Sequence, residues 1–374
     1  MSAIFQNFSN LTWQQIVMWA IGGILIYLAI KKDMEPALLL PMGFGAILVN
    51  IPMSGAITQV IEGVKEIGVL NVLFDGGIAN ELFPLLLFIG IGAMIDFEPL
   101  LTNPKLMLFG AAAQFGIFAT LVGASLLGFP LKDAASVAII GAADGPTSIF
   151  VANYLHSNYL GPIIIAAYSY MALVPIVQPP IIKLLTTKKE RRIHMEYTGN
   201  TVSQATKILF PILVTVIAGI FAPRSVALVG FLMFGNLIRE CGVLGSLSDT
   251  AQKALANLIT LLLGITVAAN MKADSFITLQ TLMILGLGLV AFIFDTAGGV
   301  VFGKIMNLFV KKKVNPMIGA AGISAFPMAS RVVHKMGLAE DNQNHLLMHA
   351  AGANVAGQIA SVIAGGVLLS LIVK

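Results

Sequence analysis

Residues 139–150 read IIGAADGPTSIF. One carboxylate, Asp144, lies in this otherwise apolar run, and Gly145 and Pro146 follow it directly. Because proline lacks a backbone N–H and clashes with the preceding turn, a continuous helix cannot pass cleanly through this point. The stretch therefore predicts an interrupted helix with a charged side chain at the interruption.

The chain as a whole is apolar and carries little charge. Of its 374 residues, 57% are hydrophobic and 11% are charged, whereas about 25% of the residues in an average globular protein are charged. This composition indicates a polytopic membrane protein with little soluble mass, and no basic, aromatic-interleaved patch suggests nucleic acid as a partner. The single cysteine, Cys241, excludes an intramolecular disulfide and a cysteine-rich zinc site.

Several apolar segments approach the length of about 20 residues that a membrane-spanning helix requires. Segment 51–80 is mixed in character, and we expect an extracytoplasmic loop or an interfacial helix there. Segments 136–155 and 315–333 are apolar but interrupted by glycine and proline. The candidate spans are 15–30, 37–50, 82–96, 106–128, 161–182, 205–221, 225–241, 255–270, 276–303 and 344–372.

Clusters of Lys and Arg predict the orientation of the chain, because these residues concentrate in cytoplasmic loops. The clusters are Lys31-Lys32, KKERR at 188–192, and KKK at 311–313. All three lie in the cytoplasm only if each interrupted segment enters and leaves on one side of the membrane. We therefore expect both interrupted segments to be re-entrant hairpins.

Short matches, in the same order, relate the two halves of the chain. Each half has five spans and one hairpin, and this odd number of crossings would invert the second half. We predict an all-α, transporter-like fold of two inverted repeats, 1–182 and 205–374, joined by a basic cytoplasmic linker at 183–204. The matches pair GIGAMID at 90–96 with GITVAAN at 264–270, IGAAD at 140–144 with IGAAG at 318–322, and IAAYSYMA at 165–172 with HAAGANVA at 349–356.

The interruption beside Asp144 predicts a cation site. An interrupted helix frees backbone N–H and C=O groups, which inside a membrane must be satisfied by protein, water or an ion. Intramembrane acids are costly and usually functional, and oxygen ligands suit Na⁺ or H⁺ rather than a transition metal. The alternative for Asp144 is a structural ion pair with a basic residue. The repeat also pairs Tyr170 with Asn354, which indicates that these two residues share a site.

The second interrupted segment, NPMIGAAGISAFPMASR at 315–331, supplies further candidates. Asn315 before Pro316 predicts a helix start, where the amide oxygen either caps the helix or also binds an ion. Ser324 either bonds to its own helix or faces the site. Arg331 either contacts solvent and lipid phosphate or binds an anionic substrate carboxylate.

Four stretches together resemble the β subunit of the sodium-pumping, biotin-dependent decarboxylases of oxaloacetate, methylmalonyl-CoA, glutaconyl-CoA and malonate. The resemblance covers essentially the whole chain. It implies that the chain decarboxylates carboxybiotin supplied by a partner subunit and not covalently bound here, and that this step drives Na⁺ export and consumes a proton. The stretches are GAADGPTSIF, AAYSYMALVPIVQPP, NPMIGAAGISAFPMASR and GANVAGQIASVIAGGVLL.

The resemblance also implies roles for individual residues, which agree with the cation site inferred above. Catalytic roles are expected for Asp144, Tyr170, Ser324 and Arg331, with Arg331 holding the substrate carboxylate. Na⁺ is the only metal expected, and its expected ligands are Asp144, Tyr170, Asn315, Ser324 and Asn354. Shaping of the broken helices is expected of Gly145, Pro146, Gly319 and Gly322.

The implied partners are a biotinylated carrier subunit, a carboxyltransferase subunit, a small membrane subunit and the lipid bilayer, with a homo-oligomer left open. The implied location is the bacterial cytoplasmic (inner) membrane, as a multi-pass protein. The alternative function is a stand-alone Na⁺-coupled secondary transporter with the same architecture. A purely structural membrane anchor is less consistent with the sequence, because an anchor gains nothing from buried ionisable groups.

Overall fold

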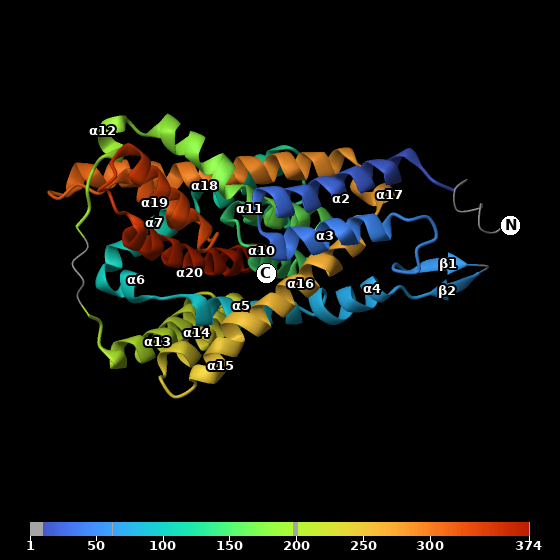
Figure 1. The fold of residues 1–374 in the computed structure, drawn as a ribbon, viewed down its shortest axis with the longest axis horizontal. Helices are drawn as coiled ribbons and strands as arrows, with labels where there is room; N and C mark the ends of the chain where they lie inside the picture. The colour runs from blue at the N-terminus through green and yellow to red at the C-terminus, as the bar shows by residue number, and fades with distance from the viewer. Residues whose placement is uncertain (1–9, 62, 197–200, 374) are drawn as a thin grey trace.

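The computed structural model describes residues 10–61, 63–196 and 201–373. Nearly all of this part of the chain is helical, apart from a short antiparallel hairpin of β1 (Gln59–Ile61) and β2 (Val64–Glu66) at one end (Figure 1). Among these described residues, seven helices are long and apolar enough to cross a membrane, or eight if one bent pair counts as a single span. The prediction of an all-α polytopic membrane protein is therefore confirmed.

The first half of the chain begins with two antiparallel neighbours, α2 (Trp13–Lys32) and α3 (Pro36–Val49), which pack against each other. A capping box of Thr12 and Gln15 fixes the start of α2. The chain then runs through α4 (Val69–Leu73), η1 (Phe74–Ile78), α5 (Leu82–Met94), α6 (Glu98–Thr102), η2 (Pro104–Leu106), α7 (Met107–Ala112), α8 (Phe115–Leu126), α9 (Leu131–Ala138), η3 (Ile139–Ala142), α10 (Gly145–Tyr154) and α11 (Leu160–Leu185).

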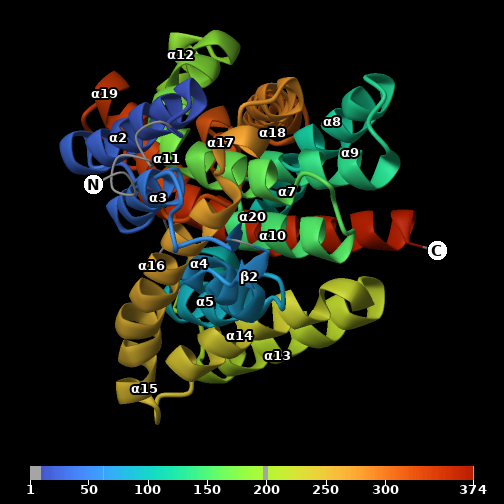
Figure 2. The same ribbon diagram turned by 90° about the vertical axis from the view of Figure 1, so that its right-hand side faces the viewer.

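The second half follows a linker that contains the short α12 (Lys188–Arg191). Figure 2 shows α13 and α14 side by side below α5, and α10 next to α20. The elements are α13 (Gln204–Phe221), η4 (Pro223–Ser225), α14 (Val226–Glu240), α15 (Gly245–Asp249), η5 (Thr250–Leu255), α16 (Ala256–Val267), η6 (Ala268–Asn270), α17 (Ala273–Phe276), α18 (Leu279–Phe309), η7 (Pro316–Gly322), α19 (Met328–Glu340) and α20 (Leu347–Ile372).

The expected spans correspond to helices, with differences in length. The spans expected at 37–50 and 225–241 are helices of only 14 and 15 residues, α3 and α14. Segment 51–80, expected as a loop or interfacial helix, holds the β-hairpin and then Val69–Ile78, which forms a bent pair with α5 at an angle of 60°. The inverted repeats, the re-entrant path and the three-part division of the chain stay predictions.

Both expected interruptions are present. The first helix ends at Ala142, Ala143 adopts a left-handed conformation with φ of 52°, and α10 starts at Gly145. The second segment is a 3-10 helix, η7, that ends at Gly322 before α19 starts at Met328. Proline at the first turn of α10 and of η7 is compatible with a helix start but not with a helix interior.

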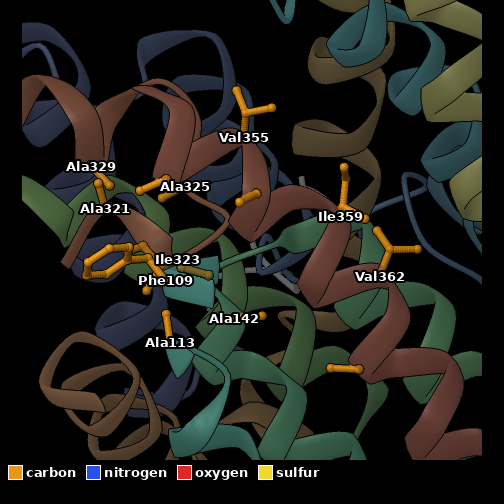
Figure 3. Packing of buried hydrophobic residues seen from close by; sticks show 14 of the residues in the cluster. Phe109, Ala113, Ala142, Ala321, Ile323, Ala325, Ala329, Val355, Ile359 and Val362 are labelled. Carbon is orange, nitrogen blue, oxygen red and sulfur yellow. The ribbon is translucent and has the colours of Figure 1, made fainter. Parts of the chain in front are cut away.

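Small residues let the interrupted segments lie deep in the molecule. Figure 3 labels several alanines in one buried cluster, among them Ala142 of the first segment and Ala321 and Ala325 of the second. In membranes such small residues allow close backbone contact. A Cβ added to Gly319 would come within 2.0 Å of the Gly299 carbonyl oxygen, so η7 reaches its position against α18 only with glycine there.

Candidate functional site

The two interrupted segments meet at Asp144. The backbone N–H of Ser324 donates to the carbonyl of Ala142 at 3.0 Å, which joins the segments directly. Asp144 is the N-cap of α10, and its Oδ1 accepts from the Thr147 N–H at 3.3 Å. The local sequence thus explains the position of the side chain, because an aspartate before Gly-Pro is a favourable N-cap.

The second oxygen of the Asp144 carboxylate accepts hydrogen bonds from three hydroxyl groups. Thr147 lies at 2.8 Å, and Ser324 and Ser361 each lie at 3.0 Å from Oδ2. Asp144 is only 3% exposed, and no ion pair between described residues includes it. The structure therefore gives no support to the alternative of a structural ion pair. Hydroxyl oxygens also accept, so these groups can rotate to face a cation.

Side-chain amides satisfy the carbonyl groups that the second interruption frees. Gln178 donates to Ala320 at 2.7 Å, Asn354 donates to Ile323 at 2.7 Å, and Gln358 donates to Ser324. The amide oxygens of these three side chains are buried and have no hydrogen-bond partner in the described part of the chain. Of the three, Gln358 lines the same cavity as Asp144, and an unpartnered oxygen beside a carboxylate fits a hard cation such as Na⁺, which binds oxygen ligands.

A cavity of about 190 Å³ reaches this cluster. Its lining includes Asp144, Tyr168, Ser324 and Gln358. The Tyr168 ring packs against Gly145, since a Cβ on that glycine would come within 2.3 Å of it, and the Tyr168 hydroxyl is buried without a partner among the described residues. Tyr168 is therefore the tyrosine of this helix that lies beside Asp144.

The structure does not bring Tyr170 and Asn315 to Asp144. The Tyr170 hydroxyl donates to the carbonyl of Leu285 on α18, because residues two apart on a helix face different sides. Asn315 caps η7, with Oδ1 accepting from the Met317 N–H at 3.1 Å. Seven residues of 3-10 helix, at about 2 Å each, separate Asn315 from the end of η7 that precedes Ser324.

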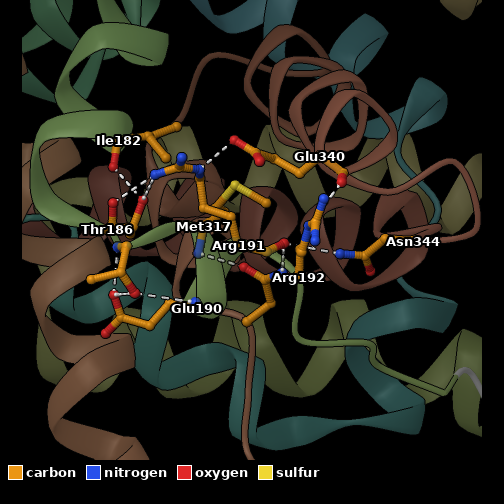
Figure 4. A network of polar contacts seen from close by, with 10 residues as sticks. Ile182, Thr186, Glu190, Arg191, Arg192, Met317, Glu340 and Asn344 are labelled. Carbon is orange, nitrogen blue, oxygen red and sulfur yellow. Dashed lines mark hydrogen bonds and ion pairs between the residues drawn. The ribbon is translucent and has the colours of Figure 1, made fainter.

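Asn315 belongs instead to a polar network that anchors the linker, and Figure 4 shows Arg191, Thr186 and Glu340 of this network. Its amide donates to the carbonyls of Arg191 and Ile193 at 2.9 and 3.0 Å. The Arg191 guanidinium pairs with Glu340 of α19 at 2.6 Å and donates to the Thr186 carbonyl at the end of α11. The start of η7, the linker and α19 are thus held together.

Of the other expected site residues, Arg331 is exposed, whereas Gly319 and Gly322 are buried. Arg331 is exposed in the first turn of α19 and does not contact Asp144. Gly319 and Gly322 both lie at close backbone contacts, Gly322 against the Phe109 carbonyl. A larger cavity of about 910 Å³ lies at the cluster of Lys311, Lys312 and Lys313, away from this site.

Sequence reasoning missed three residues that contact or border Asp144, namely Thr147, Gln358 and Ser361, and it left open whether Tyr168 belongs to the site or to packing. Asn354, Gln358 and Ser361 recur at intervals of four and three residues, the spacing of one helix face, so this periodicity in α20 was an available signal. No signal in the sequence distinguished Tyr168 from Tyr170.

Removing the Tyr168 hydroxyl is expected to weaken cation binding. In Tyr168→Phe we expect the half-saturating Na⁺ concentration of turnover to rise about tenfold, the effect of losing one hydrogen-bonding group in a charged site. Tyr170→Phe is the matched variant, and it should change the maximal rate more than the half-saturating Na⁺ concentration. Na⁺ titrations of turnover measure both, and the opposite ranking would contradict this placement of the two tyrosines.

Ordinary packing does not explain a buried carboxylate that three hydroxyl groups surround and that no basic side chain of the described residues neutralises. Acids in this position mark ion pathways, and broken helices that meet around such an acid are typical of membrane transport proteins. Among the described residues no group of three His, Cys, Asp or Glu side chains forms a transition-metal site. The fold and the site together define an ion-translocating membrane protein.

Comparison with known proteins identifies the family. The model of the Na⁺-transporting oxaloacetate decarboxylase β subunit matches residues 14–372, and the chain belongs to this family. It is 50% identical to the glutaconyl-CoA decarboxylase β subunit of Acidaminococcus fermentans, with 98% of this chain and 95% of that one covered.

Other relatives are similar over nearly the same length. Identity is 48% to the methylmalonyl-CoA decarboxylase β subunit of Propionigenium modestum, with 98% of this chain and 96% of that one covered. It is 45% to the oxaloacetate decarboxylase β chain of Klebsiella pneumoniae, with 96% and 95% covered. The chain is thus the membrane component of a sodium-translocating decarboxylase, as its resemblance implied, and the stand-alone transporter is not favoured.

Proposed function

We propose that this chain decarboxylates carboxybiotin delivered by a biotinylated partner and couples that step to Na⁺ export with consumption of a proton. Family membership supports the decarboxylase and the sodium pump. The observation that carries the ion site is the Asp144 carboxylate, which three hydroxyl groups surround and no basic side chain of the described residues neutralises.

The proposed Na⁺ site consists of Asp144 with Ser324 and Asn354, as the sequence suggested, joined by Ser361, Gln358 and the Tyr168 hydroxyl, which has no partner among the described residues. The carboxylate supplies the negative charge, and rotating hydroxyls and amide oxygens supply the remaining ligands. Direct coordination by Tyr170 and Asn315 is not part of this proposal, because their polar atoms bond to Leu285 and to the linker. Their contribution would be to hold α18 and the linker in place.

Arg331 is the proposed contact for the carboxylate of carboxybiotin. Its guanidinium is exposed at the start of α19, immediately after the second interruption, and it can bind a carboxylate through two parallel hydrogen bonds. Decarboxylation breaks the bond between the carboxyl carbon and a biotin nitrogen, releases CO₂ and transfers a proton to that nitrogen. The substrate anion and the Na⁺ site would then lie near one another on successive parts of the same segment.

The proposed complex contains a biotinylated carrier subunit, a carboxyltransferase subunit and a small membrane subunit in the cytoplasmic membrane of a bacterium. The relatives are named as β subunits or chains, which supports an assembly of several subunits. Their names also limit the acid to a small set. Glutaconyl-CoA, methylmalonyl-CoA and oxaloacetate are the first candidates.

Inside-out membrane vesicles test this function. Each candidate acid is added in turn, and ²²Na⁺ uptake is measured with and without avidin, which blocks biotin. We expect one acid to drive uptake and avidin to abolish it, and a pull-down of the tagged chain from crosslinked membranes to contain a biotinylated protein. Uptake that avidin does not affect, together with no biotin in the eluate, would support an independent transporter instead.

A further inference from the structure

Glu35 borders the same cavity as Asp144 but has no place in the function proposed so far. It lies between α2 and α3, outside the spanning helices, and it is half-buried. The lining of the cavity includes Glu35 and Leu38 at the start of α3 together with Asp144 and Ser324. One cavity of about 190 Å³ thus has an acid near the start of α3 and the proposed ion site in its interior.

The backbone holds Glu35 in a conformation that this residue rarely adopts. Its φ is 39°, in the left-handed region that favours glycine and asparagine. Pro36 follows at the first position of α3, and the Glu35 carbonyl accepts from the N–H groups of Leu38 and Leu39 at 3.0 and 2.9 Å. The side chain makes no capping hydrogen bond. The carboxylate is therefore held at the cavity without a structural task in the helix start.

Arg331 lies in the first turn of α19, a few residues after Phe326, which lines the same cavity as Glu35. Burial raises the pKa of the Glu35 carboxyl above its ordinary value, and the positive charge of Arg331 partly opposes that shift. Neither side chain takes part in an ion pair of 4.0 Å or less among the residues that the structure describes. The two groups thus act on each other through space while each is free to bind something else.

We propose that Glu35 is the first cation ligand on the route of Na⁺ to Asp144 and that Arg331 controls its strength, an inference that rests on the proposed function. While Arg331 is unoccupied, its positive charge repels Na⁺ from the cavity and weakens Glu35 as a ligand. When a carboxylate binds Arg331, that positive charge is neutralised and Glu35 attracts Na⁺. Arrival of the substrate anion and loading of the ion become linked without any covalent step.

The first test is turnover of the purified complex as a function of Na⁺ concentration. In Glu35→Gln we expect the half-saturating Na⁺ concentration to rise about fivefold, the effect of one unit charge several ångströms away at a partly solvated boundary. The maximal rate at saturating Na⁺ should stay within about twofold, and Glu35→Asp should restore much of the loss. Asp33→Asn is the matched control, because Asp33 is an exposed acid two residues away that does not line the cavity.

The second test is equilibrium binding of ²²Na⁺ to the resting complex, without carboxybiotin. Arg331→Gln should bind Na⁺ about fivefold more tightly than the wild type, and this gain should disappear when Glu35→Gln is also present. Unchanged half-saturation in Glu35→Gln, or a gain that does not depend on Glu35, overturns the inference. The proposed ion site has a separate test. If the Asp144→Asn variant kept normal Na⁺ dependence, that site would be overturned, independently of the results for Glu35.

Discussion

Asp144→Asn is expected to lower Na⁺-dependent turnover by about 100-fold or more, because it removes the charge that would bind Na⁺ in direct contact. The fold should survive the change. Asparagine is as good an N-cap as aspartate, so the bond from the Thr147 N–H to the remaining side-chain oxygen can form. The hydroxyls of Ser324 and Ser361 can accept from the new amide instead of donating to a carboxylate.

Turnover and ²²Na⁺ uptake by the complex in liposomes measure the loss, and thermal unfolding followed by size-exclusion chromatography measures the fold. Asp295→Asn is the matched control, since Asp295 is also a fully buried acid but accepts from the Ile117 N–H in α8 at 3.1 Å. That variant should keep the Na⁺ dependence of the wild type. Normal Na⁺ dependence in Asp144→Asn would remove Asp144 from the proposed ion site.

The first interruption could be predicted from sequence because its cause is local. Asp-Gly-Pro at residues 144–146 ends one helix and caps the next whatever surrounds it. The order of short matches between the two halves also marked the second interrupted segment as the counterpart of the first, and the two segments are joined by the hydrogen bond from the Ser324 N–H to Ala142. For Ser324 the residues alone left two alternatives open, and the family resemblance implied a place at the site; its hydroxyl donates to Asp144 at 3.0 Å.

The positions of Tyr168 and Tyr170 could not be predicted, because they depend on how α11 is rotated about its axis. Both residues are buried in the same helix, and packing of α11 against its neighbours, chiefly α18, α10 and α19, decides which one contacts the site. A similar limit applies to Gln358 and Ser361. The spacing of residues in α20 defines a polar face, but only its contact with the second interrupted segment assigns that face to Asp144.

The break between α7 and α8 had no local signal either. The sequence predicted one span at 106–128, and Pro104–Leu126 is one candidate span of 23 residues, interrupted only by a turn at Ala113 and Gln114, which are neither glycine nor proline. The N–H of Ile117 at the start of α8 bonds to Asp295, which is 178 residues away in the chain. A side chain that is distant in the chain therefore bonds to a backbone N–H at the start of α8, and the turn before α8 could not be found from helix-ending residues nearby in the sequence.

The second large effect is expected from Gly319→Ala in η7. An added Cβ would lie 2.0 Å from the Gly299 carbonyl oxygen of α18, a distance that only a backbone shift can relieve. Overpacking of this kind costs roughly 1–3 kcal/mol or more. Because η7 leads directly to Ile323 and Ser324, the shift should displace the second interrupted segment from Asp144 and abolish most Na⁺-dependent turnover.

Gly286→Ala is the matched control. Gly286 lies in α18, the helix that η7 contacts, but a Cβ added there would meet no atom within 4 Å. It should leave both turnover and the unfolding temperature near those of the wild type. Gly319→Ala should lower both, and the two readouts separate its effect from that of Asp144→Asn, which lowers turnover alone. If Gly319→Ala kept full Na⁺-dependent turnover, close contact between η7 and α18 would not be what holds Ser324 at the carboxylate, and the hydrogen bond from the Ser324 N–H to Ala142 would have to do so by itself.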